Sequence, residues 1–161
     1  MTERRYNEVV DQYADALFRF IVKNLRHEED ARDIVQSAFE KLWVNREKVN
    51  EETVKSYLFT IGYNLMIDLI RKMKRVSYRE DFGEHEKGVV HQTGKTNRIL
   101  DEAFNRLNEM QRSLVMLKDY EGYNYEEIGK ITGLNESQVK VYLHRARLQL
   151  RAYIVDSQNV L

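Results

Sequence analysis

Apolar residues recur at helical spacing through most of this chain, and this periodicity constrains the fold more than any other feature of the sequence. An apolar residue at every third or fourth position marks a helix that buries one face. Such stripes cover residues 6–21, 34–43, 54–69, 99–107, 110–117, 124–131 and 135–154. The sequence therefore predicts an all-α fold built from seven helices.

The apolar pattern disappears over residues 76–97, where glycines are scattered among charged and polar side chains. A structureless loop of this length is uncommon inside one compact domain. We therefore expect two small helical domains, at residues 1–75 and 98–161, joined by a flexible linker. A mobile loop within a single fold is the alternative interpretation.

The composition of the chain excludes several classes of protein. Hydrophobic residues make up 42% of the sequence and charged residues 32%, which is the balance of a folded globular protein. Cysteine is absent, which excludes disulfides and thiolate metal sites, and the four histidines lie too far apart to form a ligand pair on one helix. No apolar run approaches the roughly 18 residues of a membrane span. We expect a soluble, cytoplasmic protein without metal or cofactor.

The net charge is zero, but the charges are segregated along the chain. Basic residues cluster over residues 71–79 and 140–151, whereas acidic residues gather at 28–33 and 126–127. A basic run is in many proteins only a solvated helix face. Phosphate contacts supply most of the sequence-independent affinity for DNA, so both basic clusters are also candidates for DNA binding.

The strongest local signal is a pair of helix starts near the C-terminus. Asn124 stands three positions before Glu127, and Asn135 stands three positions before Gln138. In each pair the asparagine accepts a hydrogen bond from the backbone N–H three residues on, and the longer side chain returns one, which starts a helix. A three-residue turn beginning at Gly133 separates the two predicted helices. This arrangement is typical of a helix-turn-helix motif.

The helix predicted over residues 135–154 has one apolar and one polar face at about 100° per residue. The apolar face, expected to pack inward, consists of Val139, Leu143, Ala146, Leu150 and Ile154. A recognition helix contacts base edges with the N-terminal half of its outward face. Here that part presents Ser137, Lys140, Val141, His144 and Arg145. Arg147 and Arg151 lie further along and to the side, which suits phosphate contacts. Leu148 also faces outward, and nothing in the pattern explains it.

Two motifs give the chain a resemblance to a known family. The run Leu114 to Arg151 resembles region four of the extracytoplasmic-function (ECF) sigma factors of bacterial RNA polymerase, through Tyr120-Glu121-Gly122, Tyr125-Glu126-Glu127-Ile128 and Leu143-His144-Arg145-Ala146-Arg147. The run Asp30 to Trp43 is similar to the polymerase-binding region two of that family, and Tyr57 to Arg71 resembles its promoter-melting helix. Two motifs in this order are far more specific than a helix-turn-helix alone.

The resemblance implies a role for particular residues. It assigns Asp33 and Gln36 to the interface with the clamp coiled coil of core polymerase. It places Tyr57 and Asn64, with the loop at 49–53, at the minus-ten promoter element, where an unpaired base needs an aromatic face and polar groups. The residues that would follow the DNA backbone there are Arg71, Lys72, Lys74 and Arg75. Those that match positions facing the minus-thirty-five element are Tyr125, Glu126, Lys140, Val141, His144 and Arg145.

The sequence is thus interpreted as a sigma factor of the ECF type and not an enzyme, with core RNA polymerase and promoter DNA as partners. The resemblance adds a membrane-anchored anti-sigma factor as a candidate partner, and no small-molecule substrate is expected. Two other hypotheses stay open. A helix-turn-helix regulator working without polymerase would bind a palindromic site, and a helical interaction protein would bind no DNA. The acidic cluster beside Asp33 and Gln36 favours the sigma factor.

Overall fold

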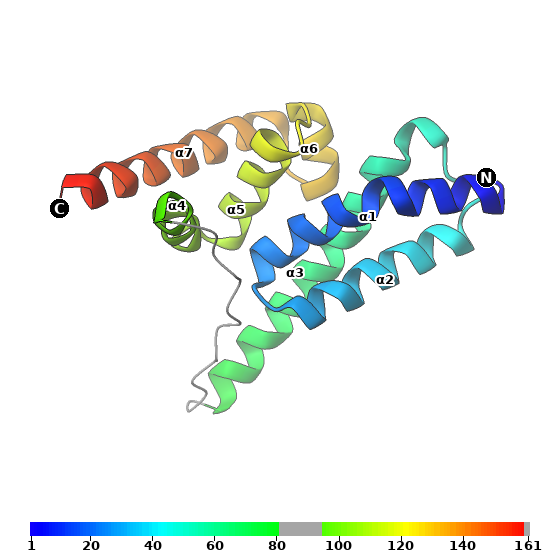
Figure 1. The fold of residues 1–161 in the computed structure, drawn as a ribbon, viewed down its shortest axis with the longest axis horizontal. Helices are drawn as coiled ribbons and strands as arrows, with labels where there is room; N and C mark the ends of the chain where they lie inside the picture. Colours follow the sequence, from blue (N-terminus) through cyan, green and yellow to red (C-terminus); the bar gives the residue numbers. More distant parts are fainter. Residues whose placement is uncertain (81–94, 160–161) are drawn as a thin grey trace. The chain divides into compact units, whose positions relative to one another are not determined.

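The computed structural model describes residues 1–80 and 95–159, with side chains described for residues 1–76 and 98–158. Within this part of the chain, helices are the only regular secondary structure (Figure 1). The chain divides into two compact units, Met1–Val89 and Val90–Leu161. The prediction of an all-α fold is therefore confirmed.

The N-terminal unit is a bundle of long helices. These are α1 (Glu3–Leu25), α2 (Glu28–Val44) and α3 (Val54–Glu80), with the short 3-10 helix η1 (Glu51–Thr53) directly before α3. Each long helix contacts the other two. Arg26 ends α1 in the left-handed conformation, with φ of 59°, and the imidazole Nδ1 of His27 then accepts a hydrogen bond from the Asp30 N–H to start α2. The connection between α1 and α2 is therefore very short.

The core of the N-terminal unit consists of the predicted apolar stripes. The rings of Phe20 and Phe59 are fully buried, with centroids 5.5 Å apart. Gly62 lets α3 approach α1 closely, since a Cβ added there would lie 2.9 Å from Leu17 Cδ1. Tyr63 is buried in this core, and burial raises the pKa of its phenol.

The C-terminal unit is built from shorter helices packed around a long one. Its elements are α4 (Lys95–Asn105), α5 (Glu109–Val115), the π-helical turn η2 (Met116–Tyr120), α6 (Tyr125–Thr132) and α7 (Glu136–Asn159). Helix α7 packs against α4, α5 and α6. On its predicted inward face, Val139, Leu143 and Ala146 are buried, whereas Leu150 and Ile154 are half-buried. The inward face of α7 thus forms the centre of this unit.

Helices extend into both ends of the range predicted as a linker. Helix α3 continues to Glu80 and α4 begins at Lys95. The apolar periodicity of the sequence did not reveal this end of α3, because residues 71–76 are all exposed and form no buried apolar face. The helix can continue there because lysine, arginine and methionine are good helix formers. The remaining predicted linker positions, 81–94, lie outside the described residues.

In the described part of the chain, no helix combines the length and the apolar character that crossing a membrane requires. Among the same residues, no three histidine, aspartate or glutamate side chains are grouped so that they could hold a metal ion.

Candidate nucleic-acid and protein interfaces

Helices α6 and α7 form the helix-turn-helix that the sequence predicts. Asn124 Oδ1 accepts a hydrogen bond from the Glu127 N–H at 2.8 Å, and Glu127 Oε1 accepts one from the Asn124 N–H at 3.2 Å. Asn135 and Gln138 exchange the same pair of bonds at 2.8 and 3.0 Å. Gly133 turns the chain between the helices with φ of +80°. Both predicted capping pairs are confirmed.

The turn of this motif is packed tightly against α6. A Cβ added at Gly129 would lie 2.7 Å from the carbonyl oxygen of Leu134, a backbone atom of the turn. On the exposed side of α6, Glu126 forms an ion pair with Lys130 at 3.5 Å. The angle between α6 and α7 is therefore fixed by backbone contact as well as by the caps.

The outward face of α7 carries the residues expected to read DNA. Exposed side chains on it include Ser137, Lys140, Val141, His144 and Arg145, as well as Arg151 further along. Val141 is 45% exposed and Leu148 is 52% exposed, so apolar groups lie on this face too. A helix that presents polar and apolar groups in this way can meet both base edges and thymine methyl groups in a major groove.

Lys140 is held in place by two neighbours. Its Nζ atom lies 3.6 Å from Glu136 Oε1 and 5.3 Å from the ring centroid of Tyr125. Lys118 Nζ lies 4.8 Å from the same centroid, so Tyr125 is in contact with two ammonium groups. Attraction between a cation and an aromatic face contributes about 0.5–1 kcal/mol at exposed sites. Tyr125, expected at the DNA interface, thus also orders a basic side chain of the recognition helix.

Arg147 has a partner that the sequence did not indicate. Its guanidinium donates hydrogen bonds from Nε, at 3.2 Å, and from Nη2 to the two carboxylate oxygens of Asp119 on η2. The hydrogen bond to Asp119 is the main reason why the pKa of Arg147 is raised, and Tyr125 adds a smaller contribution. A phosphate contact by Arg147 would therefore compete with a carboxylate of its own domain.

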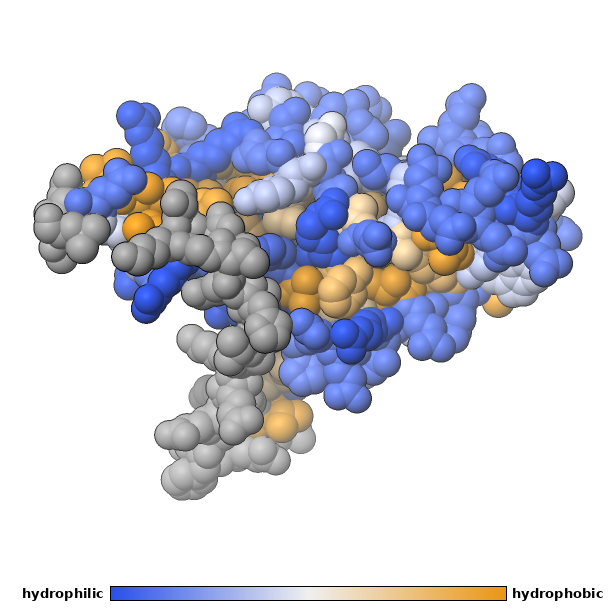
Figure 2. Space-filling model, viewed as in Figure 1, coloured by the Kyte–Doolittle hydropathy of each residue, from blue (hydrophilic) through white to orange (hydrophobic). Residues whose placement is uncertain are grey.

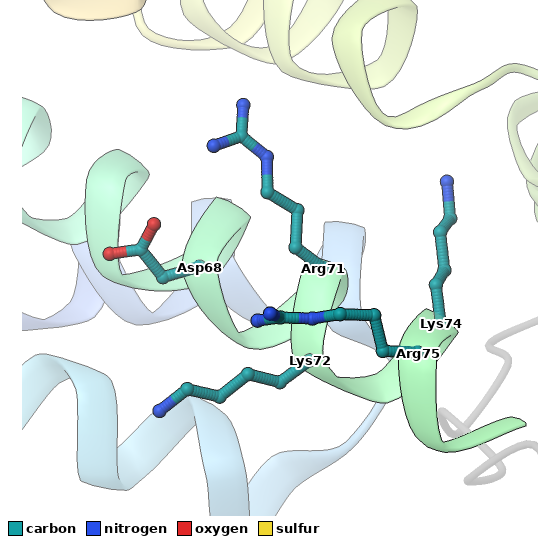
Figure 3. Close-up of a pocket in the computed structure, with 5 residues that line it drawn as sticks. All are labelled: Asp68, Arg71, Lys72, Lys74 and Arg75. Atoms are coloured by element: carbon teal, nitrogen blue, oxygen red, sulfur yellow. The ribbon is translucent and has the colours of Figure 1, made fainter. Parts of the chain in front are cut away.

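The C-terminal half of α3 presents a basic surface (Figure 3). A pocket of about 610 Å³ is lined there by Asp68, Arg71, Lys72, Lys74 and Arg75. Figure 3 shows the long basic side chains projecting from successive turns of the helix. Four cations beside one carboxylate leave a net positive surface that attracts phosphate groups. The structure thus gathers the four predicted backbone-contacting residues in one place and adds Asp68 to them.

The residues expected at the minus-ten element lie on the same helix. Tyr57, Asn64 and Arg71 recur at intervals of seven residues, which places them along one face of α3. Tyr57 is half-buried, and the other two are exposed. Before α3, Asn50 Oδ1 accepts a hydrogen bond from the Glu52 N–H at 3.1 Å and so caps η1. The loop at 49–53 therefore contains a short capped helix rather than irregular chain.

A groove between α1 and α2 was not predicted from the sequence. It has a volume of about 710 Å³, and Figure 2 shows an apolar band along these two helices. Its apolar lining includes Val10, Phe18, Val35 and Phe39, and its charged lining consists of Asp15, Arg32 and Glu40. Gln36 also lines it and donates a hydrogen bond to Glu40 Oε1 at 3.4 Å. Asp33 is exposed on α2 but does not line the groove.

Two family models match the chain, one in each unit. The model described as sigma-70 region 2 matches residues 9–76, and that described as sigma-70, region 4 matches residues 97–150. Individual relatives agree over most of this chain. The ECF RNA polymerase sigma factor SigE of Mycolicibacterium smegmatis is 28% identical over 96% of this chain, which spans 63% of that protein. RNA polymerase sigma factor SigV of Bacillus subtilis is 30% identical over 88% of this chain and 86% of its own length.

Solved structures share the fold. The sigma factor RpoE of Bartonella quintana, solved in complex with the anti-sigma factor NepR, matches with a TM-score of 0.83 and 24% identity over 94% of this chain and 97% of its own. CnrH, solved in complex with the cytosolic domain of CnrY, matches with a TM-score of 0.71 and 22% identity over 97% of this chain and 90% of its own. At these identities the likeness is one of fold.

Proposed function

Because this chain belongs to the extracytoplasmic-function sigma factors of bacterial RNA polymerase, we propose that it directs core polymerase to specific promoters and initiates transcription there. The observation that supports this most strongly is that each unit presents its own exposed basic surface, on α3 in one and on α7 in the other. The protein acts as a specificity subunit and not as a catalyst. It works in the cytoplasm, where polymerase and chromosome meet.

The N-terminal unit docks on core polymerase through α2. Gln36 lies in the α1–α2 groove, and Asp33 lies on the exposed surface of the same helix. A groove with an apolar lining and both signs of charge suits the side of an amphipathic helix, as in a coiled coil. We assign Asp33 and Gln36 to hydrogen bonds with such a helix of core polymerase.

DNA is contacted by both units. On α3, Tyr57 and Asn64 receive an unpaired base of the minus-ten element, and the basic surface follows the backbone. On the helix-turn-helix, the minus-thirty-five element is met by Tyr125, Glu126, Ser137, Lys140, Val141, His144 and Arg145, with Arg151 on a phosphate. The exposure of the α7 residues supports this assignment.

Run-off transcription tests the proposal. The purified chain and purified core polymerase are incubated, together and separately, with fragmented genomic DNA of the host. We expect discrete transcripts only from the combination, with start sites that share two sequence elements at a fixed spacing. Failure to produce promoter-specific transcripts, together with footprints on palindromic sites in the absence of core enzyme, would instead identify a regulator that acts without polymerase.

A second experiment tests the docking assignment. Asp33→Ala and Gln36→Ala should weaken binding to core polymerase without changing helicity, because both side chains contribute little to the core of the unit. Lys41→Ala, at another exposed position of α2, is the matched control. Binding is measured by fluorescence anisotropy of labelled variants titrated with core enzyme. Unchanged affinity in both variants would exclude this face of α2 as the docking site.

The two solved relatives described above are complexes with protein partners, an anti-sigma factor in one and a cytosolic domain in the other. We propose that this chain also has an anti-sigma partner, anchored in the membrane. Co-purification from detergent-solubilised host membranes tests this, and the captured protein should abolish run-off transcription when added back. Absence of any inhibitory protein in the membrane fraction would contradict it.

A further inference from the structure

Two basic residues of α7 that were both expected to contact DNA, Lys140 at base edges and Arg147 at a phosphate, lie in different surroundings. Lys140 and Arg147 are seven residues apart, so they lie on the same side of the helix about two turns apart. Lys140 contacts Glu136 and the Tyr125 ring, whereas Arg147 engages both carboxylate oxygens of Asp119. Both cations therefore contact other elements of the domain, and Arg147 is the one held by two hydrogen bonds, to a residue 28 positions earlier in the sequence.

Asp119 reaches Arg147 from a specialised backbone segment. It lies in η2, where the Glu121 N–H donates to the Met116 carbonyl oxygen at 2.9 Å, five residues back. Such π-helical turns are rare and contain one residue more than an α-helical turn. This π turn ends the helical stretch that α5 begins. The carboxylate that reaches the side of α7 therefore projects from the π turn itself.

Tyr125 lies between η2 and Lys140. Its ring centroid is 4.8 Å from Nζ of Lys118, on η2, and 5.3 Å from Nζ of Lys140, on α7. Segment η2 thus reaches α7 at two points, directly through Asp119 at Arg147 and through Lys118 and Tyr125 at Lys140. An Arg–carboxylate pair held by two parallel hydrogen bonds fixes geometry as well as charge.

We propose that Asp119 and Arg147 are positioning residues of the helix-turn-helix, which fix α7 against η2 and thereby orient Lys140, beside the ring of Tyr125, toward the base edges of the minus-thirty-five element. This role rests on the proposed function, because it concerns how that element is read. Arg147 is not a phosphate contact in this arrangement. The side chains of Arg147 and Asp119 are 44% and 39% exposed, and ion pairs this exposed contribute little to stability. The pair therefore serves to orient α7 and adds little to the free energy of folding.

The pair is tested with Arg147→Lys, Arg147→Gln and Asp119→Asn in the full chain bound to core polymerase. Transcription is measured from a promoter library randomised at the minus-thirty-five element, at two salt concentrations. A positioning pair needs the planar guanidinium, so Arg147→Lys should lose selectivity nearly as much as Arg147→Gln. We expect the ratio between preferred and mismatched promoters to fall by roughly three- to tenfold in all three variants. The salt dependence should not change, and combining Arg147→Gln with Asp119→Asn should add little.

Phosphate contact by Arg147 predicts the opposite pattern. Arg147→Lys would then resemble the wild type, Arg147→Gln would weaken all promoters alike and flatten the logarithmic salt slope by about one, and Asp119→Asn would strengthen DNA binding. Any of these results overturns the inference, as does unchanged selectivity in all three variants. Arg151→Gln is the matched control, because it should show the phosphate pattern.

Two further measurements separate the possible failures. Thermal unfolding of each variant shows whether lost selectivity is only lost folding, and the exchanged pair Asp119→Arg with Arg147→Asp should recover selectivity if orientation is what matters. Wild-type holoenzyme that shows no promoter preference contradicts the proposed function itself. Wild-type preference that survives all three substitutions contradicts only the positioning role.

Discussion

The two units orient their functional side chains by different means. In the N-terminal unit, the candidate residues project from α2 and α3, which are 17 and 27 residues long and share a three-helix core with α1. In the C-terminal unit, the candidate residues project mainly from α7, which has 24 residues, but its supporting helices α6 and α5 have only 8 and 7. Isolated helices this short are unstable in water. The first unit therefore orients its functional side chains by packing along the whole length of its helices. The second relies more on local contacts, such as capping pairs at helix ends.

These local contacts are concentrated around the recognition helix α7. Helices α5 and α6 each begin with a reciprocal capping box, and Asn135 and Gln138 form the same pair before α7. The Asp119–Arg147 pair and the contacts of Tyr125 with two lysines add tethers between elements. The comparison teaches that a unit whose supporting helices are short can hold one helix in a fixed orientation through directional contacts.

The largest effect is expected from a cavity in one unit. Phe20→Ala removes a fully buried ring that packs on Phe59, and it should lower the free energy of unfolding of the N-terminal unit by about 3–5 kcal/mol. Hydrogen exchange followed by mass spectrometry should show faster exchange in α1–α3 and unchanged exchange in α5–α7. Leu143→Ala is the reciprocal variant, with loss confined to α5–α7. Equal loss in both units would mean that the two do not fold separately.

A matched pair of glycine-to-alanine substitutions compares how well the two units accommodate an added methyl group at a close helix contact. Gly129→Ala places a methyl group against the Leu134 carbonyl oxygen, a backbone atom that cannot rotate away, so we expect a loss of about 1–3 kcal/mol. Gly62→Ala meets the end of the Leu17 side chain, which can rotate, and alanine is favoured over glycine in a helix by about 1 kcal/mol. Its net effect should be smaller. Thermal denaturation checks both, and a greater loss for Gly62→Ala would reverse the comparison.

If the C-terminal unit reads bases, substitutions of different basic residues on α7 should have different effects on promoter selectivity. Lys140→Ala and Arg145→Ala should each remove about 1–3 kcal/mol of discrimination at particular minus-thirty-five positions. Arg151→Ala should weaken all sequences alike, because a phosphate carries no sequence information. The promoter-library assay at two salt concentrations measures both quantities. Uniform, sequence-independent losses for Lys140 and Arg145 variants would mean that this face only grips the backbone.

The smallest expected effect compares the helix starts of the two units. Asn135→Ala removes the Oδ1 atom that accepts the hydrogen bond from the Gln138 N–H at 2.8 Å, while the backbone N–H of residue 135 can still donate to Gln138 Oε1. The loss should cost the C-terminal unit about 1 kcal/mol. His27→Ala removes the hydrogen bond from the Asp30 N–H to the imidazole at the start of α2. This bond is 3.2 Å long, against 2.8 Å for the bond at Asn135, so the loss should be smaller. Urea denaturation of the two variants gives the values. An equal or larger loss at His27 would show that the N-terminal unit depends on its helix caps at least as much as the C-terminal unit does.

The sequence by itself determined the helices, the two capping pairs of the helix-turn-helix and the outward face of α7. Each depends on residues within a few positions of one another, because a helix face repeats every 3.6 residues and a capping pair spans three. The same local pattern missed the last turns of α3, since an exposed helix end has no apolar stripe to reveal it.

Only the tertiary structure decided which side chains from distant segments meet. The sequence predicts a phosphate contact for Arg147, but the fold places Asp119, 28 residues earlier, within hydrogen-bond distance of its guanidinium. The α1–α2 groove likewise combines apolar residues of two helices, and it includes Gln36 but not Asp33. Contacts of this kind depend on how the helices pack across the core. The order of polar and apolar residues along the chain does not show which residues of different helices will lie side by side after folding.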